Sequence, residues 1–216
     1  MRQDWNGKNS KKYIVLILAA LAFIICVWNA SDPLQKGIAD KILRFHILAN
    51  SDSDEDQEVK KKVRDQVGQM MAPLLEDASG LAETQEIVTA HMDEIVCTAE
   101  ETLRAEGYTY GASARLARVS FPVKTYGDYT FPAGEYEALE ITLGEGKGHN
   151  WWCVLYPNMC FQGTVYEVVE ESADEALREV LTPAEYADVF DSGNFEIRFR
   201  FLELLKGKKD DKRSNY

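Results

Sequence analysis

Two cysteines in the second half of the chain are the residues whose type and spacing most directly indicate chemistry. Cys153 and Cys160 bracket Tyr156-Pro157-Asn158, and Pro and Asn are typical of tight turns. A hairpin-like turn here would bring the two sulfurs into bonding range. We therefore predict a disulfide between Cys153 and Cys160, worth about 2–3 kcal/mol through closure of a short loop. Such a bond persists in an oxidising compartment, so the prediction depends on where the chain is located.

His149 and Cys153 suggest a second kind of chemistry, a thiol nucleophile with its general base. However, the segment has the pattern of a strand, in which side chains four residues apart do not meet, and a disulfide-bonded Cys153 cannot attack a substrate. The sequence also shows no serine nucleophile elbow, zinc-protease helix or phosphate loop. We therefore predict no catalytic residues and no enzyme, and we keep a secreted cell-wall or periplasmic hydrolase as the alternative function.

A run of acidic residues after position 50 resembles a calcium loop at its start. Asp52, Asp54 and Asp56 stand at alternate positions, as calcium ligands do. The pattern then fails, because Gln57 occupies the position of the turn glycine and Val63 that of the bidentate glutamate. Acids in the first turn of a helix explain the run better. We predict no metal and no cofactor.

The N-terminus has the pattern of an export signal. Basic residues precede an unbroken apolar run over residues 13–28. The basic flank keeps the N-terminus inside and directs residues 29–216 out of the cytoplasm. The run is shorter than the roughly 20 residues that a membrane-spanning helix prefers, and cleavage after Ala30 would place bulky Trp28 where a small residue is favoured. Residues 1–30 are therefore either an uncleaved anchor or an inefficiently cleaved signal peptide, and both interpretations stay open.

The charge of the chain restricts its partners. The net charge is −12, and the first twelve residues carry +3, which leaves −15 on the exported part. Nucleic acid and anionic lipid surfaces are therefore disfavoured, and membrane contact is expected only through the N-terminal segment. The remaining residues suit one domain with a real core. We expect a linker over 31–40, a domain over 41–203 and a charged tail over 204–216.

The hydrophobic pattern of the first half predicts a strand followed by two helices. Residues 41–49 predict a strand that is buried on both faces, because their apolar side chains do not alternate. Residues 54–74 and 81–106 have helical spacing, and Gly107 ends the second helix. The apolar positions expected to face the core are Val59, Val63, Val67, Met70, Leu74, Val88, Met92, Ile95, Ala99 and Leu103.

The second half predicts strands and two short helices. The strands cover 115–121, 135–143, 150–156 and 195–201, and the third is expected to be central because both of its faces are apolar. In the second strand the apolar parity switches between Ala138 and Leu139, which indicates a bulge or two buried faces. Capping boxes at Ser172–Glu175 and Thr182–Glu185 predict the two helices. This order predicts an α+β fold, with a mixed sheet backed by the two longer helices in a single domain.

Several polar residues in these elements have simple structural interpretations. Cys97, in a helical pattern, is expected to be a small buried side chain. His46 and His91 are expected to be structural histidines within a strand and a helix. Glu140 belongs to a row of glutamates along a strand, for which a solvated face is the expectation.

Three long blocks of the sequence carry a resemblance to a known family. The first comprises Arg44-Phe-His-Ile-Leu-Ala-Asn-Ser-Asp-Ser53 and residues 56–65, the second comprises residues 121–127 and 129–138, and the third is Asn150-Trp-Trp-Cys-Val-Leu-Tyr-Pro-Asn-Met-Cys-Phe161. In these blocks the chain resembles the stage II sporulation protein R family of endospore-forming Firmicutes. The resemblance covers residues 41–161, and residues 162–203 form a divergent C-terminal part.

The resemblance implies a role as a signal between two cells. Proteins of this kind are made in the forespore and exported to the space between the two membranes that separate it from the mother cell. There they activate a membrane-embedded aspartic protease of the mother cell, which removes the pro-sequence of sigma-E. By this resemblance the chain is an activating ligand in the intermembrane space, either released or anchored by residues 13–28.

The residues that contact such a receptor do not follow from the resemblance, so we select them on physical grounds. Exposed aromatic side chains dominate binding hot spots, and loops on a rigid scaffold usually carry binding. The alternative for the two tryptophans is that both belong to the core, one on each face of a central strand. The candidate receptor-binding residues are Asn50, Ser51, Asp52, Tyr126, Tyr129, Trp151 and Trp152.

Overall fold

The computed structural model describes residues 13–15, 17–18, 33–157, 159–160 and 171–190 of the chain. The predicted strand 195–201 and the charged tail 204–216 lie outside the described residues. No described helix has the length and apolar character needed to cross a membrane.

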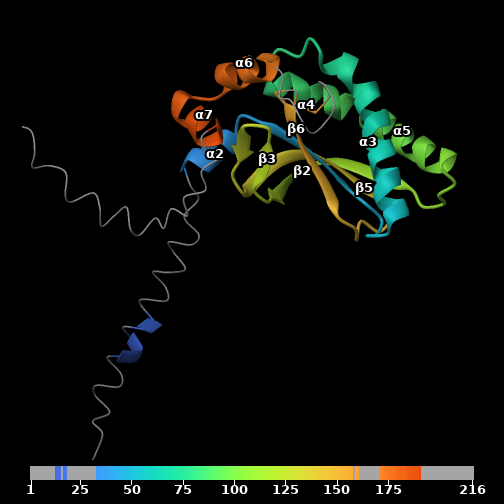
Figure 1. Cartoon of the computed structure of the whole chain (residues 1–216), viewed down its shortest axis with the longest axis horizontal. Coiled ribbons are helices and arrows are strands. Elements are labelled where there is room, and N and C mark those ends of the chain that lie inside the picture. Colours follow the sequence, from blue (N-terminus) through green and yellow to red (C-terminus); the bar gives the residue numbers. More distant parts are fainter. Residues whose placement is uncertain (1–12, 16, 19–32, 158, 161–170, 191–216) are drawn as a thin grey trace, which may run out of the picture.

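A four-stranded mixed sheet forms the centre of the domain, in the order β2-β5-β1-β6 (Figure 1). Strands β1 (Leu43–Leu48) and β5 (Gly134–Leu143) are parallel, whereas β2 (Ala112–Phe121) and β6 (Asn150–Tyr156) run antiparallel to their neighbours. The α+β prediction with a mixed sheet in one domain is confirmed. Within the described residues, however, β6 lies at an edge rather than at the centre. Its two apolar faces arise because both sides of the sheet are covered.

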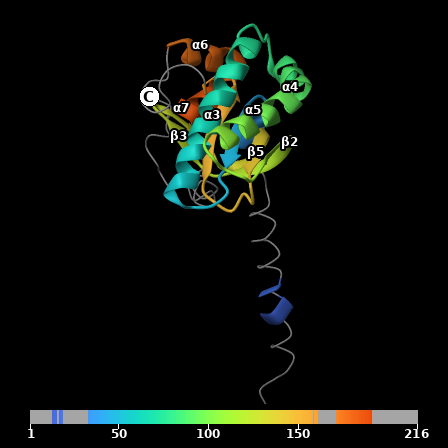
Figure 2. The ribbon, with the colours of Figure 1, turned by 90° about the vertical axis from the view of Figure 1, so that its right-hand side faces the viewer.

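Three helices cover one face of the sheet (Figure 2). They are α3 (Asp54–Leu75), α4 (Leu81–Ala90) and α5 (Met92–Ala105). The prediction of one helix over 81–106 is wrong, because the helix is interrupted at His91, with φ −104° and ψ 17°. The His91 side chain places Nδ1 2.8 Å from the carbonyl oxygen of Ile87, where it competes with the backbone for that acceptor.

The core between the helices and the sheet follows the expected helical period with one shift. Val59, Val63 and Val67 are buried in α3 as predicted, but Met71 and Leu75 then continue the four-residue spacing. Met70 and Leu74, which were expected at these positions, are partly buried at the margin of the same cluster. From the sheet, the cluster takes Leu43, Phe45, Ile47, Leu139, Ile141, Leu143, Trp151, Cys153 and Leu155.

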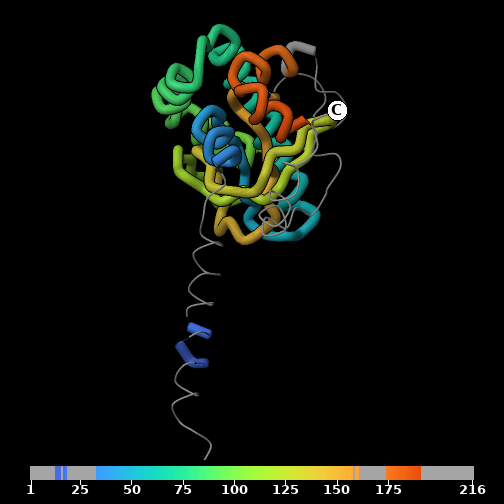
Figure 3. The backbone as a smooth tube through the Cα atoms, turned by 90° about the vertical axis from the view of Figure 1, so that its left-hand side faces the viewer, coloured from blue at the N-terminus to red at the C-terminus, as the bar shows by residue number. Residues whose placement is uncertain are grey.

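The opposite face is covered at one end by smaller elements (Figure 3). These are α2 (Pro33–Ala39), α7 (Pro183–Phe190) and a hairpin of β3 (Lys124–Tyr126) and β4 (Tyr129–Phe131). Helix α6 (Glu171–Val180) packs against α7. Two expectations need correction here: residues 33–39 form a helix instead of a linker, and α6 begins one residue before its predicted cap.

Helix α2 forms within the expected linker because its apolar side chains have somewhere to pack. Ile38 is fully buried and Ala39 nearly so, in the cluster on the second face of the sheet. That same cluster explains the parity switch in β5. Ala138 packs on the second face and Leu139 on the first, while the register with β2 stays unbroken. The switch therefore reflects two buried faces and not a bulge.

Candidate functional site

The predicted receptor-binding residues do not gather at one place. Asn50–Asp52 lie in the loop after β1, Tyr126 and Tyr129 belong to the β3–β4 hairpin, and Trp151 and Trp152 point to opposite faces of β6. We call the loop of Asn50–Asp52 and its contacts the loop junction. We call the surroundings of Arg44, to which Tyr126 belongs, the aromatic cage. The aromatic cage buries Arg44, and the loop junction buries Asp56 and Lys60.

The loop junction joins the segment after β1 to the turn before β6. The side-chain oxygen of Asn50 accepts a hydrogen bond from the backbone N–H of Glu145 (3.0 Å), and the Asn50 carbonyl accepts one from Lys147 (3.2 Å). The Asp52 carboxylate accepts the backbone N–H of His149 at 2.6 Å and also contacts its ring. These bonds hold the pKa of Asp52 below its usual value, with the backbone of His149 as the main cause.

The junction is tight enough to require glycine at one position. A Cβ atom added to Gly148 would lie 2.1 Å from the carbonyl oxygen of Ser51, a backbone atom that cannot move aside. The N–H of Gly148 donates to the carbonyl of Ala49 at 2.9 Å. The two loops are thus fixed by backbone contact as well as by side chains.

Asp56 is the buried carboxylate of the loop junction and is only 6% exposed, while Lys60, 5% exposed, donates from Nζ to the His149 carbonyl at 2.8 Å. Its carboxylate accepts hydrogen bonds from Asn50 Nδ2 (2.9 Å), Ser51 Oγ (2.5 Å) and Tyr110 Oη (2.6 Å). Ser53 caps α3 by accepting the backbone N–H of Asp56 at 3.2 Å. Burial by itself would raise the pKa of Asp56, but the three side-chain donors outweigh it and the pKa lies below its ordinary value.

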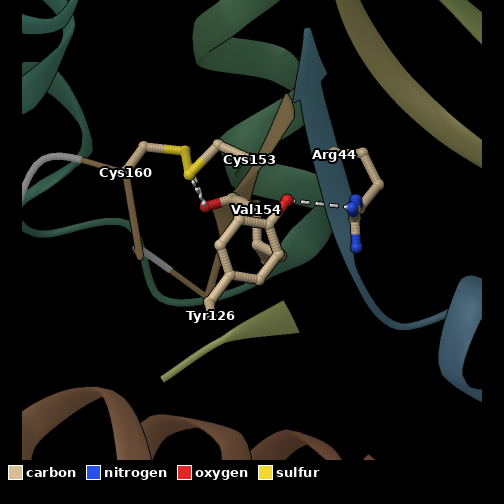
Figure 4. Close-up of a disulfide and its surroundings, with 5 residues drawn as sticks. All are labelled: Arg44, Tyr126, Cys153, Val154 and Cys160. Atoms are coloured by element: carbon tan, nitrogen blue, oxygen red, sulfur yellow. Dashed lines mark hydrogen bonds between the residues drawn. A yellow bond between two sulfur atoms is a disulfide. The ribbon is translucent and has the colours of Figure 1, made fainter. Parts of the chain in front are cut away.

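Arg44 is the buried charge of the aromatic cage and has no exposed surface. Its guanidinium carbon lies 4.6 Å from the ring centre of Phe121, 5.1 Å from Phe131, 5.2 Å from Tyr136 and 5.7 Å from Tyr126. Nη2 donates to the Tyr126 hydroxyl at 3.2 Å (Figure 4), whereas Nε and Nη1 have no hydrogen-bond partner within the described part of the chain. Burial lowers the pKa of Arg44.

Tyr129 lies beside the cage and is packed inside the domain. It is 5% exposed, and its hydroxyl donates to the carboxylate of Asp174, which also accepts from Tyr186. Arg178 is the main cause that lowers the pKa of Asp174 to about 2, followed by the two tyrosines. The expectation that Tyr129 is an exposed aromatic residue is therefore wrong, and its contacts tie the hairpin to α6 and α7.

The two tryptophans face different layers, and Trp151 alone belongs to the core, so the alternative interpretation is correct for Trp151 only. Trp151 is 8% exposed and packs edge-on against Phe45, with the Arg64 guanidinium 5.4 Å from its ring centre. Trp152 is half-buried and stacks on His46 with ring centres 4.9 Å apart and planes 4° apart. Of the two, only Trp152 keeps appreciable surface for a partner.

His46, Glu140 and Arg115 form another polar cluster, which lies beneath Trp152. His46 is 1% exposed, and its Nε2 lies 3.2 Å from Glu140 Oε2. Arg115 Nε donates to Glu140 Oε1 at 2.7 Å. Burial lowers the pKa of His46, and the nearby Glu140 opposes that effect. Glu140 is thus buried between Arg115, with which it forms an ion pair, and His46, and the expectation of a solvated face is wrong for it.

The structure joins Cys153 and Cys160 in a disulfide, with Cα atoms 5.9 Å apart (Figure 4). The sulfur of Cys160 lies 2.8 Å from the carbonyl oxygen of Val154. The Cys153 sulfur is therefore not a free thiolate. His149 is exposed, and its ring contacts Asp52. The residues of the hydrolase alternative thus do not form a nucleophile pair.

The structure corrects one further expectation about a side chain. Cys97 is exposed and free, so the prediction of a buried side chain is wrong: it lies on the outward side of α5. Among the described residues, no three His, Cys, Asp or Glu side chains are arranged to hold a metal ion.

Comparison with known proteins decides the family. The family described as stage II sporulation protein R has a sequence model that matches residues 39–166. The chain is also 40% identical over 153 residues to the stage II sporulation protein R of Bacillus subtilis (strain 168), which covers 70% of this chain and 68% of that protein. The chain belongs to the stage II sporulation protein R family. No solved structure shows significant similarity to it.

The region matched by the stage II sporulation protein R family contains both the loop junction and the aromatic cage. Residues 39–166 include every strand of the sheet, the loop junction, the aromatic cage and both cysteines of the disulfide. Helices α6 and α7 lie beyond the matched region, although α7 packs on the β3–β4 hairpin.

Sequence reasoning missed the buried charges of this family member, and some signals for them were present. Arg44 is a charged residue inside a strand that was predicted to be buried on both faces, which is a reason to expect special surroundings. Asp56 follows the capping residue Ser53 by three positions, where a side chain can bond back to the loop. The aromatic partners of Arg44 come from distant segments, so no local pattern identifies them.

Proposed function

We propose that this member of the family is an exported signal protein of endospore formation. It acts from the space between forespore and mother cell on a membrane-embedded aspartic protease of the mother cell, and the result is processing of pro-sigma-E. The observation that carries the proposal is the 40% identity to the Bacillus subtilis stage II sporulation protein R over 153 residues.

Two features of the chain support the exported location in this proposal. Basic residues precede the apolar run 13–28, the order that directs the following domain across the membrane. The Cys153–Cys160 disulfide is a bond that oxidising compartments favour and the cytosol does not.

A protein that acts by contact needs side chains that reach a partner. Of the candidates, Asp52 is exposed, and Asn50, Ser51, Tyr126 and Trp152 are half-buried. Their position in fixed surroundings means that little conformational entropy is lost on binding. We assign the contact role to these five, and we assign Trp151 and Tyr129 to the support of the surface.

Deleting the gene in the sporulating host tests the proposal, with processing of the sigma-E precursor as the measurement. We expect the precursor to accumulate unprocessed, and the full chain supplied in trans to restore processing. A variant that lacks residues 1–30 keeps the domain in the cytoplasm and should fail to restore it. Normal processing in the deletion strain would end the proposal, and restoration by the cytoplasmic variant would end the exported location.

Mass spectrometry of the exported protein, without reductant, tests the state of the chain. It measures the mature N-terminus, which distinguishes a cleaved signal peptide from an anchor, and the mass of the Cys153–Cys160 segment. We expect that mass to be two hydrogens below that of the reduced segment. Two free thiols in the exported protein would contradict the disulfide.

A further inference from the structure

Strand β2 (Ala112–Phe121) is a long strand at one edge of the sheet that the described residues form. It pairs antiparallel with β5 over all ten of its residues, and within the described part of the chain no strand pairs with its other side. Figure 2 shows it at the margin of the sheet, beyond α5. An edge of this kind carries a row of backbone donors and acceptors that another strand can use.

The register shows which backbone groups point outward. The N–H of Gly144 donates to the carbonyl of Gly111 at 2.9 Å, so the backbone groups of Gly111 face β5. In an antiparallel pair the residues that face the partner alternate with those that face away. The outward-facing residues of β2 are therefore Ala112, Ala114, Leu116, Arg118 and Ser120.

This edge lacks most of the features that protect edge strands from pairing. The strand contains no proline, its register with β5 is continuous, and it is ten residues long. Its two arginines are exposed but bonded to β5: Arg115 donates to Glu140, and Arg118 donates weakly to the backbone carbonyl of Glu135 at 3.4 Å. Short length, bulges and proline are the usual protective devices, and β2 has none of them.

The charge of the edge indicates which partner it fits. β2 carries two arginines and no acid, in a domain whose net charge is strongly negative. Glu140 and Glu137 of β5 already lie opposite Arg115 and Arg118, and a second copy of β2 would bring two more arginines and no further carboxylate to the same edge. A strand that places an acidic side chain opposite Arg118 would instead form a favourable cross-strand pair.

We propose that the outer edge of β2 binds an extended acidic segment of a partner protein, which adds a fifth strand to the sheet. Backbone hydrogen bonds at the five outward-facing residues supply the affinity, and Arg118 selects for acidic side chains. If the proposed function holds, that partner is the mother-cell protease, and this part of the inference rests on it. The edge itself does not.

Two variants test the edge in sporulating cells. Ala114→Pro removes an outward N–H without removing a bond to β5, and Arg118→Glu reverses the charge. We expect each to reduce sigma-E precursor processing at least tenfold while the amount of exported protein is unchanged. The matched controls are Ala82→Pro, in the first turn of α4 where proline is tolerated, and Lys61→Glu on the exposed side of α3.

Normal processing in both edge variants would overturn the proposal, as would an equal loss in the controls. Circular dichroism of each purified variant confirms that it is folded. Arg118→Glu changes no backbone group, so it remains informative if Ala114→Pro does not fold.

A second experiment does not involve the protease and therefore separates failure of the edge from failure of the proposed function. The probe is a ten-residue peptide of alternating threonine and glutamate, with a threonine–lysine peptide as the control. We expect the acidic peptide alone to slow hydrogen exchange at least tenfold at the outward-facing amides of β2. Equal protection by both peptides, or none, would overturn the proposal. A dimer through β2 in analytical ultracentrifugation would overturn it in favour of self-pairing.

Discussion

The Asp56 carboxylate at the loop junction and the Arg44 guanidinium in the aromatic cage are buried charges of opposite sign, and their surroundings differ. Asp56 has three side-chain donors on its carboxylate and one capping bond to its backbone. Arg44 has one hydrogen bond and four aromatic rings around its guanidinium, and among the described residues two of its nitrogens have no hydrogen-bond partner. The Asp56 carboxylate is therefore held by hydrogen bonds, whereas the Arg44 guanidinium is held mainly by contacts with aromatic rings.

The difference teaches that burial alone does not tell whether a charge stabilises a fold. A buried charge is costly unless hydrogen bonds or an opposite charge replace the water it loses. At the loop junction this replacement is complete, so the charge holds two loops and a helix start together. In the cage, π faces offset only part of the loss, since a cation–π contact contributes about 0.5–2 kcal/mol. We therefore expect removal of the two charges to have very different effects.

The largest expected effect is that of Asp56→Ala. The change leaves Asn50, Ser51 and Tyr110 without their shared acceptor, and unmade bonds of buried groups cost about 1–3 kcal/mol each. We expect the free energy of unfolding, measured by urea denaturation, to fall by about 3 kcal/mol or more. Asp54→Ala, which removes an exposed acid of the same helix turn, should cause a much smaller loss. Equal losses would show that helix charge, and not the junction, is what matters.

The pH dependence of stability sharpens the same contrast. The folded-state pKa of Asp56 is depressed, so its contribution is fully present above the unfolded value of about 3.9 and is lost as pH falls through the folded pKa. We expect the stability gap between the natural protein and Asp56→Asn to narrow below about pH 4, by about 1.4 kcal/mol for each unit of depression. Denaturant titrations from pH 7 to pH 2.5 measure the gap. A gap that stays constant would contradict the assignment.

Arg44 gives no comparable signal in that pH range. Burial lowers the pKa of Arg44, but a guanidinium in a protein stays protonated throughout this pH range. Arg44→Met should therefore leave the shape of the stability curve between pH 3 and pH 9 unchanged. The two charges thus differ in acid response as well as in bonding.

The contrast also explains how far the sequence predicted the molecule. The strands β1, β5 and β6, the long helix α3 and the Thr182–Glu185 capping box follow from local periodicity and spacing, and the cap forms with Glu185 Oε2 2.7 Å from the N–H of Thr182. The disulfide prediction needed only a turn between two cysteines, and the structure contains it. Such features depend on residues that are near one another in the sequence.

The aromatic cage and the cluster of His46, Glu140 and Arg115 could not be predicted because they depend on how distant strands are arranged in the sheet. Arg44 meets Phe121 and Phe131 only because β1 lies next to β5 and the hairpin folds over them. Glu140 has the sequence pattern of a solvated glutamate until β5 is placed between β1 and β2. The prediction that Tyr129 is exposed was wrong for the same reason, since α6 and α7 cover it.

A double-mutant cycle measures how strongly the cage holds its cation. The single variants are Arg44→Met and Phe131→Leu, which keep most of the packed volume, and the double variant combines them. We expect a coupling free energy of about 1 kcal/mol from urea denaturation, the size of a cation–π contact that is shielded from water. The Leu103→Met and Phe131→Leu pair, on opposite faces of the sheet, is the control and should show no coupling. No coupling for Arg44 would mean that the rings only fill space around it.

The smallest expected effect is the one that most sharply separates the two charges. Arg44→Met removes a desolvated cation and leaves an apolar side chain of similar length among aromatic rings. Replacing poorly compensated buried charges with apolar residues is often neutral or stabilising. We expect the free energy of unfolding to change by less than about 1 kcal/mol, against the large loss for Asp56→Ala. A loss above about 3 kcal/mol would show that the guanidinium is compensated as fully as the carboxylate. If stability is unchanged, the fold does not require the charge, and sigma-E precursor processing by Arg44→Met then tests whether the proposed function does.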